Sequence, residues 1–379
     1  MEPKQNQPKR ENLYKISELS KKLNITPRTI RFYEQMSLLP PARRTQGKMR
    51  LFDEADIKRI QEIRGLQKDR GMSLEQIKKY LGDEKQASPE QLAQKRLRIV
   101  TDVTCSLPET FFAEHDVPRL PIFIKVDKQI YGDKVKITNA ELFNEVQRRG
   151  AFPSTLPADD KTLLQFFRKL SAEGAEQVLV LTLSTHLSDT FKRVSHIAQK
   201  FRDLHIDVVD TRTSAAGLGI LVCEALRLKN EGLRLLEIKT RIEFLAPQVY
   251  QVFTVGSLEH LYKSGRVSPE VSGYMSLLLS FKPILALRLG KGHIELVGRA
   301  DTSEAAYQKM FEFFQRYLED KPEPRYVAVT TNGLLPDAET LIKTIHTHYP
   351  QANILLAEGH PVLGVHLGPQ SVGLAVLSA

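Results

Sequence analysis

The sequence predicts an α/β protein in two parts, a small basic helical domain and a longer region where strands and helices alternate. First, the 379 residues are enough for two or three domains. Second, the net charge of +9 lies at one end: residues 1–100 hold 23 Lys and Arg against 13 Asp and Glu. Third, the apolar spacing changes from helical to strand-like near Leu97. A basic excess confined to one part indicates a polyanionic partner for that part alone.

Helix signals follow one another closely at the start of the chain. Apolar residues Ile16, Leu19 and Leu23 at helical spacing, with Ser17 as the expected cap, predict a first helix. Thr26 before Pro27 predicts the start of a second helix after a tight turn. Two short helices joined in this way form a helix-turn-helix, whose second helix can enter the major groove of DNA.

A basic hairpin follows the two helices. The stretch "ARRTQGKMRLF" is expected to turn near Gly47 and to form a wing beside the phosphate backbone. Asp53 and Ser73 are then expected to cap a third and a fourth helix. Helix-turn-helix, wing and localised charge agree with one another, which favours DNA binding over an ordinary solvated basic surface.

Residues 13–83 resemble the winged helix-turn-helix domain of MerR-type transcription regulators through "ISELSKKLNI", "RTIRFYEQMSLL", the wing ending in "RLF", and "GMSLEQIKKYL". The resemblance implies a homodimer that binds and distorts double-stranded promoter DNA. The residues expected near DNA are Arg28, Thr29, Arg31, Tyr33, Arg43, Arg44, Lys48 and Arg50. Residues 1–12 are expected to form a flexible tail.

The sequence departs from the MerR pattern after this domain. MerR-type proteins usually continue into a long pairing helix, whereas residues 84–96 allow only a short linker or helix containing Pro89. Dimers would therefore form either through a shortened helix or through the second region.

The second region predicts βαβ units and a largely parallel sheet, because short β-branched runs such as "LRIVTDV" and "YVAVTT" alternate with helical stretches. Hydroxyl-rich loops follow several of the strands, among them "TDVTCSLP", "FPSTLPADD", "STHLSDTF" and "TRTSAAGLG". A single Ser or Thr usually caps a helix. Several at neighbouring strand ends indicate a shared site for a carboxylate or phosphate.

Other functional classes have little support in the sequence. The two cysteines, Cys105 and Cys223, lie in no metal-binding spacing and fit a reducing compartment. We find no nucleotide-binding, zinc-protease or nucleophile-elbow motif, so we expect no catalytic residues, no metal and no cofactor beyond a bound ligand. No signal peptide and no uncharged apolar run long enough for a membrane helix is found, which predicts a cytoplasmic protein without membrane insertion.

Residues 97–379 resemble the DegV family, bacterial proteins that bind fatty acids, through "FPSTLPA", "LSTHLSDTF", "SLEHLYKSGRVS" and "GVHLGPQSVGL" in family order. The resemblance implies two α/β lobes, divided near residue 256, with a long-chain fatty acid between them. The residues expected to hold its carboxylate are Ser154, Thr155, Ser184, Thr185, Arg266 and His366. His366 could instead be a structural histidine, and Arg266 could position a loop or face a protein partner.

Three departures from the family pattern affect this expected site. Asp102-Val103 replaces Asp-Ser, "STLP" replaces Thr-Ser-Gln-Pro, and Asp189 replaces a glycine. Asp189 would weaken anion binding if it pointed inward and would be harmless if it pointed outward. A tunnel for the acyl chain could be lined by Met275, Leu277–Leu279 and Phe281, which could equally be ordinary core.

The sequence therefore predicts a one-component transcription regulator that binds promoter DNA and senses a fatty acid or related acyl ligand. The alternative is a carrier that presents its fatty acid to a separate fatty-acid kinase, with the basic domain serving localisation or partner contact. RNA polymerase is a further candidate partner of the regulator. An enzyme acting on acyl substrates is a third class, but the sequence offers no clear nucleophile.

Overall fold

The computed structural model describes residues 13–40, 42–45, 49–70, 73–78, 96–132, 136–256, 258–267, 281–333 and 336–378. The chain divides into two compact units, Met1–Leu92 and Ala93–Ala379, and each has a hydrophobic core of its own. The expected tail, Lys48, residues 84–95 of the expected linker, Met275 and Leu277–Leu279 lie outside the described residues.

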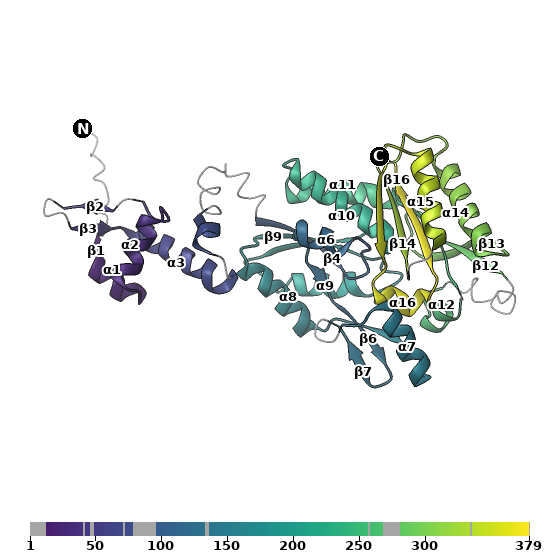
Figure 1. Ribbon diagram of the computed structural model, residues 1–379, viewed down its shortest axis with the longest axis horizontal. Coiled ribbons are helices and arrows are strands. Elements are labelled where there is room, and N and C mark those ends of the chain that lie inside the picture. Colours follow the sequence, from purple (N-terminus) through teal and green to yellow (C-terminus); the bar gives the residue numbers. More distant parts are fainter. Residues whose placement is uncertain are drawn as a thin grey trace, which may run out of the picture. The chain divides into compact units, whose positions relative to one another are not determined.

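The first unit is a small helical domain with a three-stranded sheet in the order β1-β3-β2 (Figure 1). Its elements are β1 (Tyr14–Lys15), α1 (Ile16–Leu23), α2 (Pro27–Gln35), β2 (Arg43–Arg44), β3 (Arg50–Phe52) and α3 (Glu54–Arg70), and residues 74–78 are also helical. The antiparallel pairing of β2 with β3 forms the wing. The winged helix-turn-helix predicted from the sequence is confirmed.

Local capping explains where the helices of the first unit begin. The Thr26 hydroxyl accepts a hydrogen bond from the Thr29 backbone N–H, as expected for the cap of α2. Asp53 caps α3 by accepting from the Ala55 and Asp56 N–H groups, and Ser73 accepts from Gln76. The expected cap Ser17 is wrong, because α1 already begins at Ile16 and Ser17 lies inside the helix.

The second unit alternates strands and helices along the chain. Its strands are β4 (Leu97–Asp102), β5 (Arg119–Leu120), β6 (Ile122–Val126), β7 (Gln129–Tyr131), β8 (Ser154–Pro157), β9 (Gln177–Thr182), β10 (His205–Asp210), β11 (Tyr250–Thr254), β12 (Lys282–Leu287), β13 (Ile294–Ala300), β14 (Tyr326–Thr331), β15 (Asn353–Glu358) and β16 (Val372–Leu377). Its helices are α6 (Glu109–Glu114), α7 (Asn139–Arg149), α8 (Asp160–Ala172), α9 (Thr190–Ala198), α10 (Ala215–Asn230), α11 (Leu235–Leu245), η1 (Ala246–Gln248), α12 (Glu259–Ser264), α14 (Ser303–Leu318), α15 (Pro336–His348) and α16 (Pro361–Leu367).

Three sheets organise this unit. A four-stranded sheet has the order β10-β9-β4-β5, and its three ladders are all parallel. A six-stranded sheet has the order β13-β12-β11-β16-β14-β15. A small antiparallel sheet, β7-β6-β8, lies beside them. The predicted two-lobed α/β fold is confirmed, with one lobe built on each large sheet (Figure 1).

The predicted parallel arrangement is correct for the four-stranded sheet and wrong for the six-stranded sheet. In the latter only β14 and β15 are parallel, and the other ladders are antiparallel. The reason lies in two connections. β12 and β13 are joined by a short turn without a crossover helix, and the C-terminal strand β16 inserts between β11 and β14 in the opposite direction.

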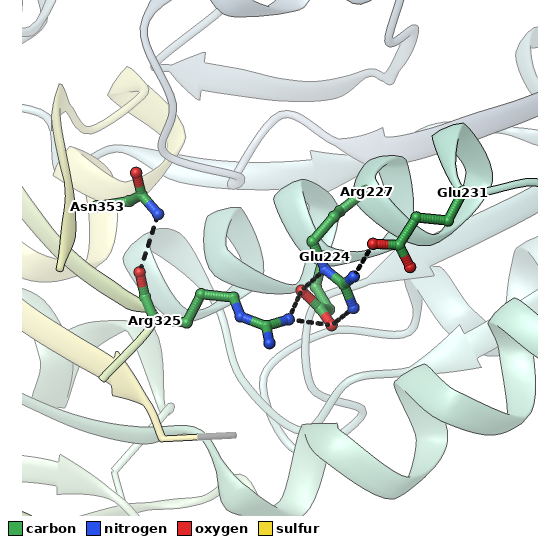
Figure 2. Close-up of polar contacts among 5 residues, drawn as sticks. All are labelled: Glu224, Arg227, Glu231, Arg325 and Asn353. Atoms are coloured by element: carbon green, nitrogen blue, oxygen red, sulfur yellow. Dashed lines mark hydrogen bonds and ion pairs between the residues drawn. The ribbon is translucent and has the colours of Figure 1, made fainter. Parts of the chain in front are cut away.

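Helix α10 joins the two lobes of the second unit. Nearly all its residues are buried, as expected for a helix apolar on every side, and it packs against β4 and β9 of one sheet and β14 and β16 of the other. Glu224 on this helix is 1% exposed and accepts hydrogen bonds from Arg227, at 2.6 and 2.9 Å, and from Arg325 just before β14, at 3.3 and 3.4 Å (Figure 2). This ion cluster fixes α10 to the second lobe.

Candidate functional site

The loops that follow the parallel strands are held by a buried carboxylate. Asp102, at the end of β4, is fully buried. One of its oxygens accepts from the backbone N–H and the hydroxyl of Thr104, and the other accepts from the N–H of Leu183, after β9. Burial raises the pKa of Asp102, although these hydrogen bonds oppose the rise. Asp102 therefore sets the relative position of two of the hydroxyl-rich loops.

A cavity of about 320 Å³ lies between the two lobes of the second unit. The first lobe contributes the loop after β9, including Leu183 and Leu187. The second lobe contributes strand residues such as Phe253 and Leu287, and helix α16 contributes Leu363. The lining combines apolar side chains with nearly as many polar ones, which is compatible with an amphipathic small molecule.

Two of the predicted polar residues meet at this cavity. Thr155 on β8 and His366 on α16 both line it, and 3.1 Å separates the Thr155 hydroxyl oxygen from His366 Nε2. Burial, assisted by the charge of Arg266, lowers the pKa of His366 to about 3, so the imidazole is neutral at physiological pH. Among the described residues, its Nδ1 is buried without a hydrogen-bond partner.

Arg266 brings a positive charge to the same cavity. Its guanidinium donates from Nε to the Leu187 carbonyl, at 3.4 Å, and from Nη1 to the Ser264 carbonyl. Burial lowers its pKa, which the negative charge of Asp189 partly offsets. Asp189 lines the cavity, but its side chain is 64% exposed and pairs with Lys192 at 3.3 Å. Of the two orientations considered from the sequence, the outward one is therefore observed.

Of the three remaining predicted hydroxyl residues, one lines the cavity and two do not. Thr185 lines the cavity, and its hydroxyl donates to Asp210 at 2.7 Å. Ser184 is fully buried, does not line the cavity, and donates to the Gly292 carbonyl at 2.8 Å. Ser154 is exposed and also lies outside the lining. The structure thus brings together Thr155, Thr185, Arg266 and His366, but neither Ser154 nor Ser184.

Ser184 instead holds the turn between β12 and β13 against the first lobe. The carbonyls of Gly292 and Gly290 in this turn accept from the Ser184 hydroxyl and from Arg212 Nη1, the latter at 2.7 Å. Gly292 has φ +76°, and a Cβ there would lie 2.4 Å from Ser184 Oγ and 2.6 Å from the Arg212 carbonyl oxygen. Only a glycine allows the two lobes to approach so closely at this point.

Sequence reasoning missed several polar residues of the lining, and two of them, Gln251 and Thr330, lie on strands. Gln251 on β11 accepts from Thr213 at 2.7 Å, and the hydroxyl of Thr330 on β14 is buried without a partner among the described residues. Both lie inside strands and not in the loops where hydroxyls gather. The only signal in the sequence was a polar residue interrupting an apolar run.

The candidate nucleic-acid interface lies on α2 of the first unit. Arg28 and Arg31 are exposed and three residues apart, so they share one face. Thr29 is half-buried beside them. Phe32, not predicted, is 46% exposed on the same helix. Tyr33 is 4% exposed and belongs to the core of the first unit.

On the wing, Arg50 is held by Glu34 of α2 at 2.8 Å, which fixes β3 relative to the helix. Arg43 and Arg44 are the two residues of β2, and Lys48 lies outside the described residues. In the part of the chain that the structure describes, no three His, Cys, Asp or Glu side chains gather in a way that could hold a metal ion. No described helix has both the length and the apolar character needed to cross a bilayer.

These features define a two-lobed α/β protein with a cavity between its lobes, preceded by a winged helix-turn-helix domain. Residues 96–379 match the family model described as "Uncharacterised protein, DegV family", and residues 14–84 match "MerR HTH family regulatory protein". The chain belongs to the DegV family and carries a MerR-type helix-turn-helix domain at its start.

Individual relatives agree with this assignment. A DegV domain-containing protein of Deinococcus radiodurans is 30% identical over 281 residues, which cover 74% of this chain and 98% of the relative. A structure described as fatty acid binding of a DegV family protein from Thermus thermophilus is 28% identical, with a TM-score of 0.69, over 75% of this chain and all of that chain. The fatty acid kinase B3 protein of Streptococcus pneumoniae, loaded with linoleic acid, shares the fold at 16% identity, with a TM-score of 0.64 over 75% of this chain and 99% of that chain.

Proposed function

We propose that the protein is a one-component transcription regulator. Its first unit binds promoter DNA, and its second unit senses a long-chain fatty acid or a related acyl ligand. The observation that carries the proposal is the Thr155–His366 pair on a cavity that combines apolar and polar side chains, in a chain that begins with a MerR-type domain. The similarity to the fatty-acid-binding protein of Thermus thermophilus supports the choice of ligand.

The head-group site would work through the neutral state of His366. With its proton on Nε2, the imidazole donates to the Thr155 oxygen, and the Thr155 hydroxyl proton is then directed to a carboxylate oxygen of the ligand. The Arg266 guanidinium adds a favourable charge nearby. Thr185 is a weaker donor because its hydroxyl already donates to Asp210. We assign no role in binding the carboxylate to Ser154 or Ser184.

The apolar lining supplies the affinity for the acyl chain. Each methylene that moves from water into such a lining contributes about 0.8 kcal/mol, or about fourfold in the dissociation constant. A hydrocarbon chain therefore binds well even with few polar contacts at its head.

DNA binding is assigned to Arg28, Thr29 and Arg31 of α2, with the wing beside the phosphate backbone. We infer that two copies of the protein bind two DNA half-sites and that the bound regulator contacts RNA polymerase at the same promoter. Such a regulator works in the cytoplasm. Ligand occupancy changes DNA affinity only if the ligand favours one arrangement of the two copies over another.

Native mass spectrometry of the delipidated full-length chain with added palmitate tests the ligand assignment. We expect one palmitate per chain. Thr155→Val should weaken binding about 10- to 100-fold, the cost of losing one hydrogen bond to a charged group. Thr155→Ser, which keeps the hydroxyl, should bind nearly as well as the wild type. Equal binding by the Val and Ser variants would contradict the head-group assignment.

Selection of genomic fragments from the source organism, followed by affinity measurements at several salt concentrations, tests DNA binding. Arg28→Ala/Arg31→Ala should weaken binding and lower the salt slope by about one to two units. The matched control is Lys161→Ala/Arg168→Ala, which removes two exposed charges from α8 of the second unit. Equal losses in both variants, or a wild type that selects no fragment, would contradict the regulator assignment in favour of the carrier.

A further inference from the structure

The floor of the cavity between the lobes is formed by the six-stranded sheet and carries polar as well as apolar side chains. Strands β11, β16 and β14 lie side by side there. Their antiparallel registers place Phe253, Gly373 and Thr330 in one row across the sheet. Directly paired residues, and residues two apart along a strand, point to the same face. Gln251 and Ser371 therefore share this face, and all five residues line the cavity.

Gly373 leaves an open space at the centre of this floor. A Cβ atom at Gly373 would meet no described atom closer than Phe253 Cβ, at 3.6 Å. Adjacent strands are about 4.8 Å apart, and residues two apart along a strand are separated by about 6.8 Å. The Cα atom of Thr330 thus lies about 5 Å from that of Gly373, Ser371 lies about 7 Å away, and the diagonal neighbour Gln251 about 7–8 Å. Three polar side chains surround the open space.

Two of these polar side chains are buried with unused hydrogen-bonding capacity. Gln251 is 4% exposed, and in the described part of the chain the only hydrogen bond of its side chain is with Thr213, at 2.7 Å. Whichever way the amide is turned, one of its two polar atoms contacts Thr213 and the other is left over. The Thr330 hydroxyl is buried without a partner among the described residues. A plain hydrocarbon chain would remove water from such groups and return no hydrogen bond, which weakens its binding.

None of the described residues on this floor is charged. The acidic and basic residues of the described lining, histidines aside, are Asp189 and Arg266, and both lie outside the six-stranded sheet. A second carboxylate on the ligand would be buried here without a counter-charge, which is strongly unfavourable. A hydroxyl group is neutral and both donates and accepts, so it can bond the remaining atom of the Gln251 amide in either orientation.

We propose that Gln251, Thr330 and Ser371 form a second polar subsite around Gly373, and that the ligand is an acyl chain carrying a hydroxyl group. This inference rests on the proposed function, because the subsite selects among ligands whose carboxylate is held at the head-group site. The ligand hydroxyl enters the space above Gly373 and hydrogen-bonds the Gln251 amide, with the hydroxyls of Ser371 and Thr330 beside it. The cavity thereby distinguishes a hydroxylated chain from a plain chain of the same length.

The test compares palmitate with its monohydroxy derivatives, which carry the hydroxyl at every position from the third carbon to the last, in titrations of the delipidated full-length protein. The derivatives are positional isomers, so they differ in where the hydroxyl lies and not in how many carbon atoms are buried. We expect one position, with at most its immediate neighbours, to bind about 3- to 10-fold tighter than palmitate, the net effect of one or two hydrogen bonds. A hydroxyl at the other positions should weaken binding, because it is buried without a partner.

Two variants assign this preference to the subsite. Gln251→Met keeps the length of the side chain and removes both polar atoms, so the preferred isomer should lose its advantage over palmitate. Gly373→Ala keeps the hydrogen bond between Gln251 and Thr213 and fills the open space with a methyl group. It should weaken the preferred isomer about 3- to 10-fold more than palmitate. Gln308→Met, the same change at an exposed position of α14, is the matched control and should keep the wild-type profile. A thermal melt of each variant verifies folding.

The outcomes separate the subsite from the function on which it rests. Palmitate binding as tightly as every hydroxylated isomer, or tighter, would overturn the subsite alone. So would a preferred isomer whose advantage survives in folded Gln251→Met, or in Gly373→Ala where Gln251→Met does not fold. Absence of binding of all these acids by the folded wild type would overturn the proposed function and the subsite with it. Loss of the preference in the two variants, with retention in Gln308→Met, would support both.

Discussion

The turn between β12 and β13 offers a direct test of how closely the two lobes of the second unit approach each other. Gly292 and Gly290 both have left-handed backbone, with φ +76° and +68°. An alanine at either position costs about 1–2 kcal/mol for that conformation alone. Their surroundings differ. A Cβ at Gly292 would meet Ser184 Oγ at 2.4 Å and the Arg212 carbonyl oxygen at 2.6 Å, whereas at Gly290 the nearest described atom, of Pro247, is 3.5 Å away.

Gly292→Ala must therefore move the turn away from the first lobe as well as strain the backbone. The movement breaks the 2.8 Å hydrogen bond from Ser184 and weakens the 2.7 Å bond from Arg212 to Gly290, each worth about 1 kcal/mol. We expect Gly292→Ala to cost about 3–4 kcal/mol and Gly290→Ala about 1–2 kcal/mol. The difference of about 2 kcal/mol corresponds to an additional fall of about 4–8 °C in the unfolding midpoint of this unit.

Scanning calorimetry of the full-length wild type and the two variants measures this difference. Adding Ser184→Ala to Gly292→Ala should restore little, because the Arg212 carbonyl belongs to the backbone and remains in place. Equal midpoints for the two single variants would refute the reasoning that the lobes are in close contact at Gly292.

Two further predictions concern charge. Burial alone would raise the pKa of Glu224, but the hydrogen bonds and charges of Arg227 and Arg325 outweigh burial and lower it. The cluster therefore stabilises the fold at pH values above the unfolded pKa of about 4.5. This stabilisation is lost as the pH falls through the lower pKa of the folded state. Glu224→Gln should lower the free energy of unfolding, measured with urea at pH 7, by about 2–3 kcal/mol. This is less than the full cost of breaking a buried ion pair, because both arginines are partly exposed. A loss under about 0.5 kcal/mol would count against a stabilising role of the cluster. Burial lowers the pKa of His360 to about 4. Below about pH 6.5 this histidine therefore takes up a proton in the unfolded state but stays neutral in the folded state. Its contribution should lower the free energy of unfolding by up to about 1.4 kcal/mol per pH unit between pH 6.5 and 4. His360→Asn keeps the acceptor that caps Val362 and should remove this contribution, leaving that of His366, whose pKa burial lowers to about 3. Parallel pH profiles for the variant and the wild type would rule out the assignment.

Local signals in the sequence were sufficient for much of the fold. Thr26 and Asp53 cap the helices as predicted, because a capping side chain acts on N–H groups two or three residues away. The direction of β16 was not predictable in this way. Its position between β11 and β14 depends on pairing with strands distant in the sequence, and an apolar run is equally compatible with parallel and antiparallel neighbours.

In the candidate site, too, the sequence identified some residues correctly and could not place others. Thr155 and His366, 211 residues apart, were both proposed from family resemblance, and the fold brings them within hydrogen-bonding distance. Ser184 and Thr185 are adjacent and chemically similar, so the sequence could not tell that one faces the Gly292 turn and the other the cavity. Gln251 lies within a buried strand, where only the tertiary structure shows that it reaches the cavity lining.

The most direct test of a ligand-sensing regulator is the affinity of the full-length chain for its selected DNA fragment, measured with delipidated protein and again with one equivalent of palmitate. We predict a difference of about 5- to 150-fold between the two states, and no difference in Thr155→Val at the same palmitate concentration. Identical DNA affinities for delipidated and palmitate-loaded wild type, with loading verified by mass spectrometry, would contradict the account.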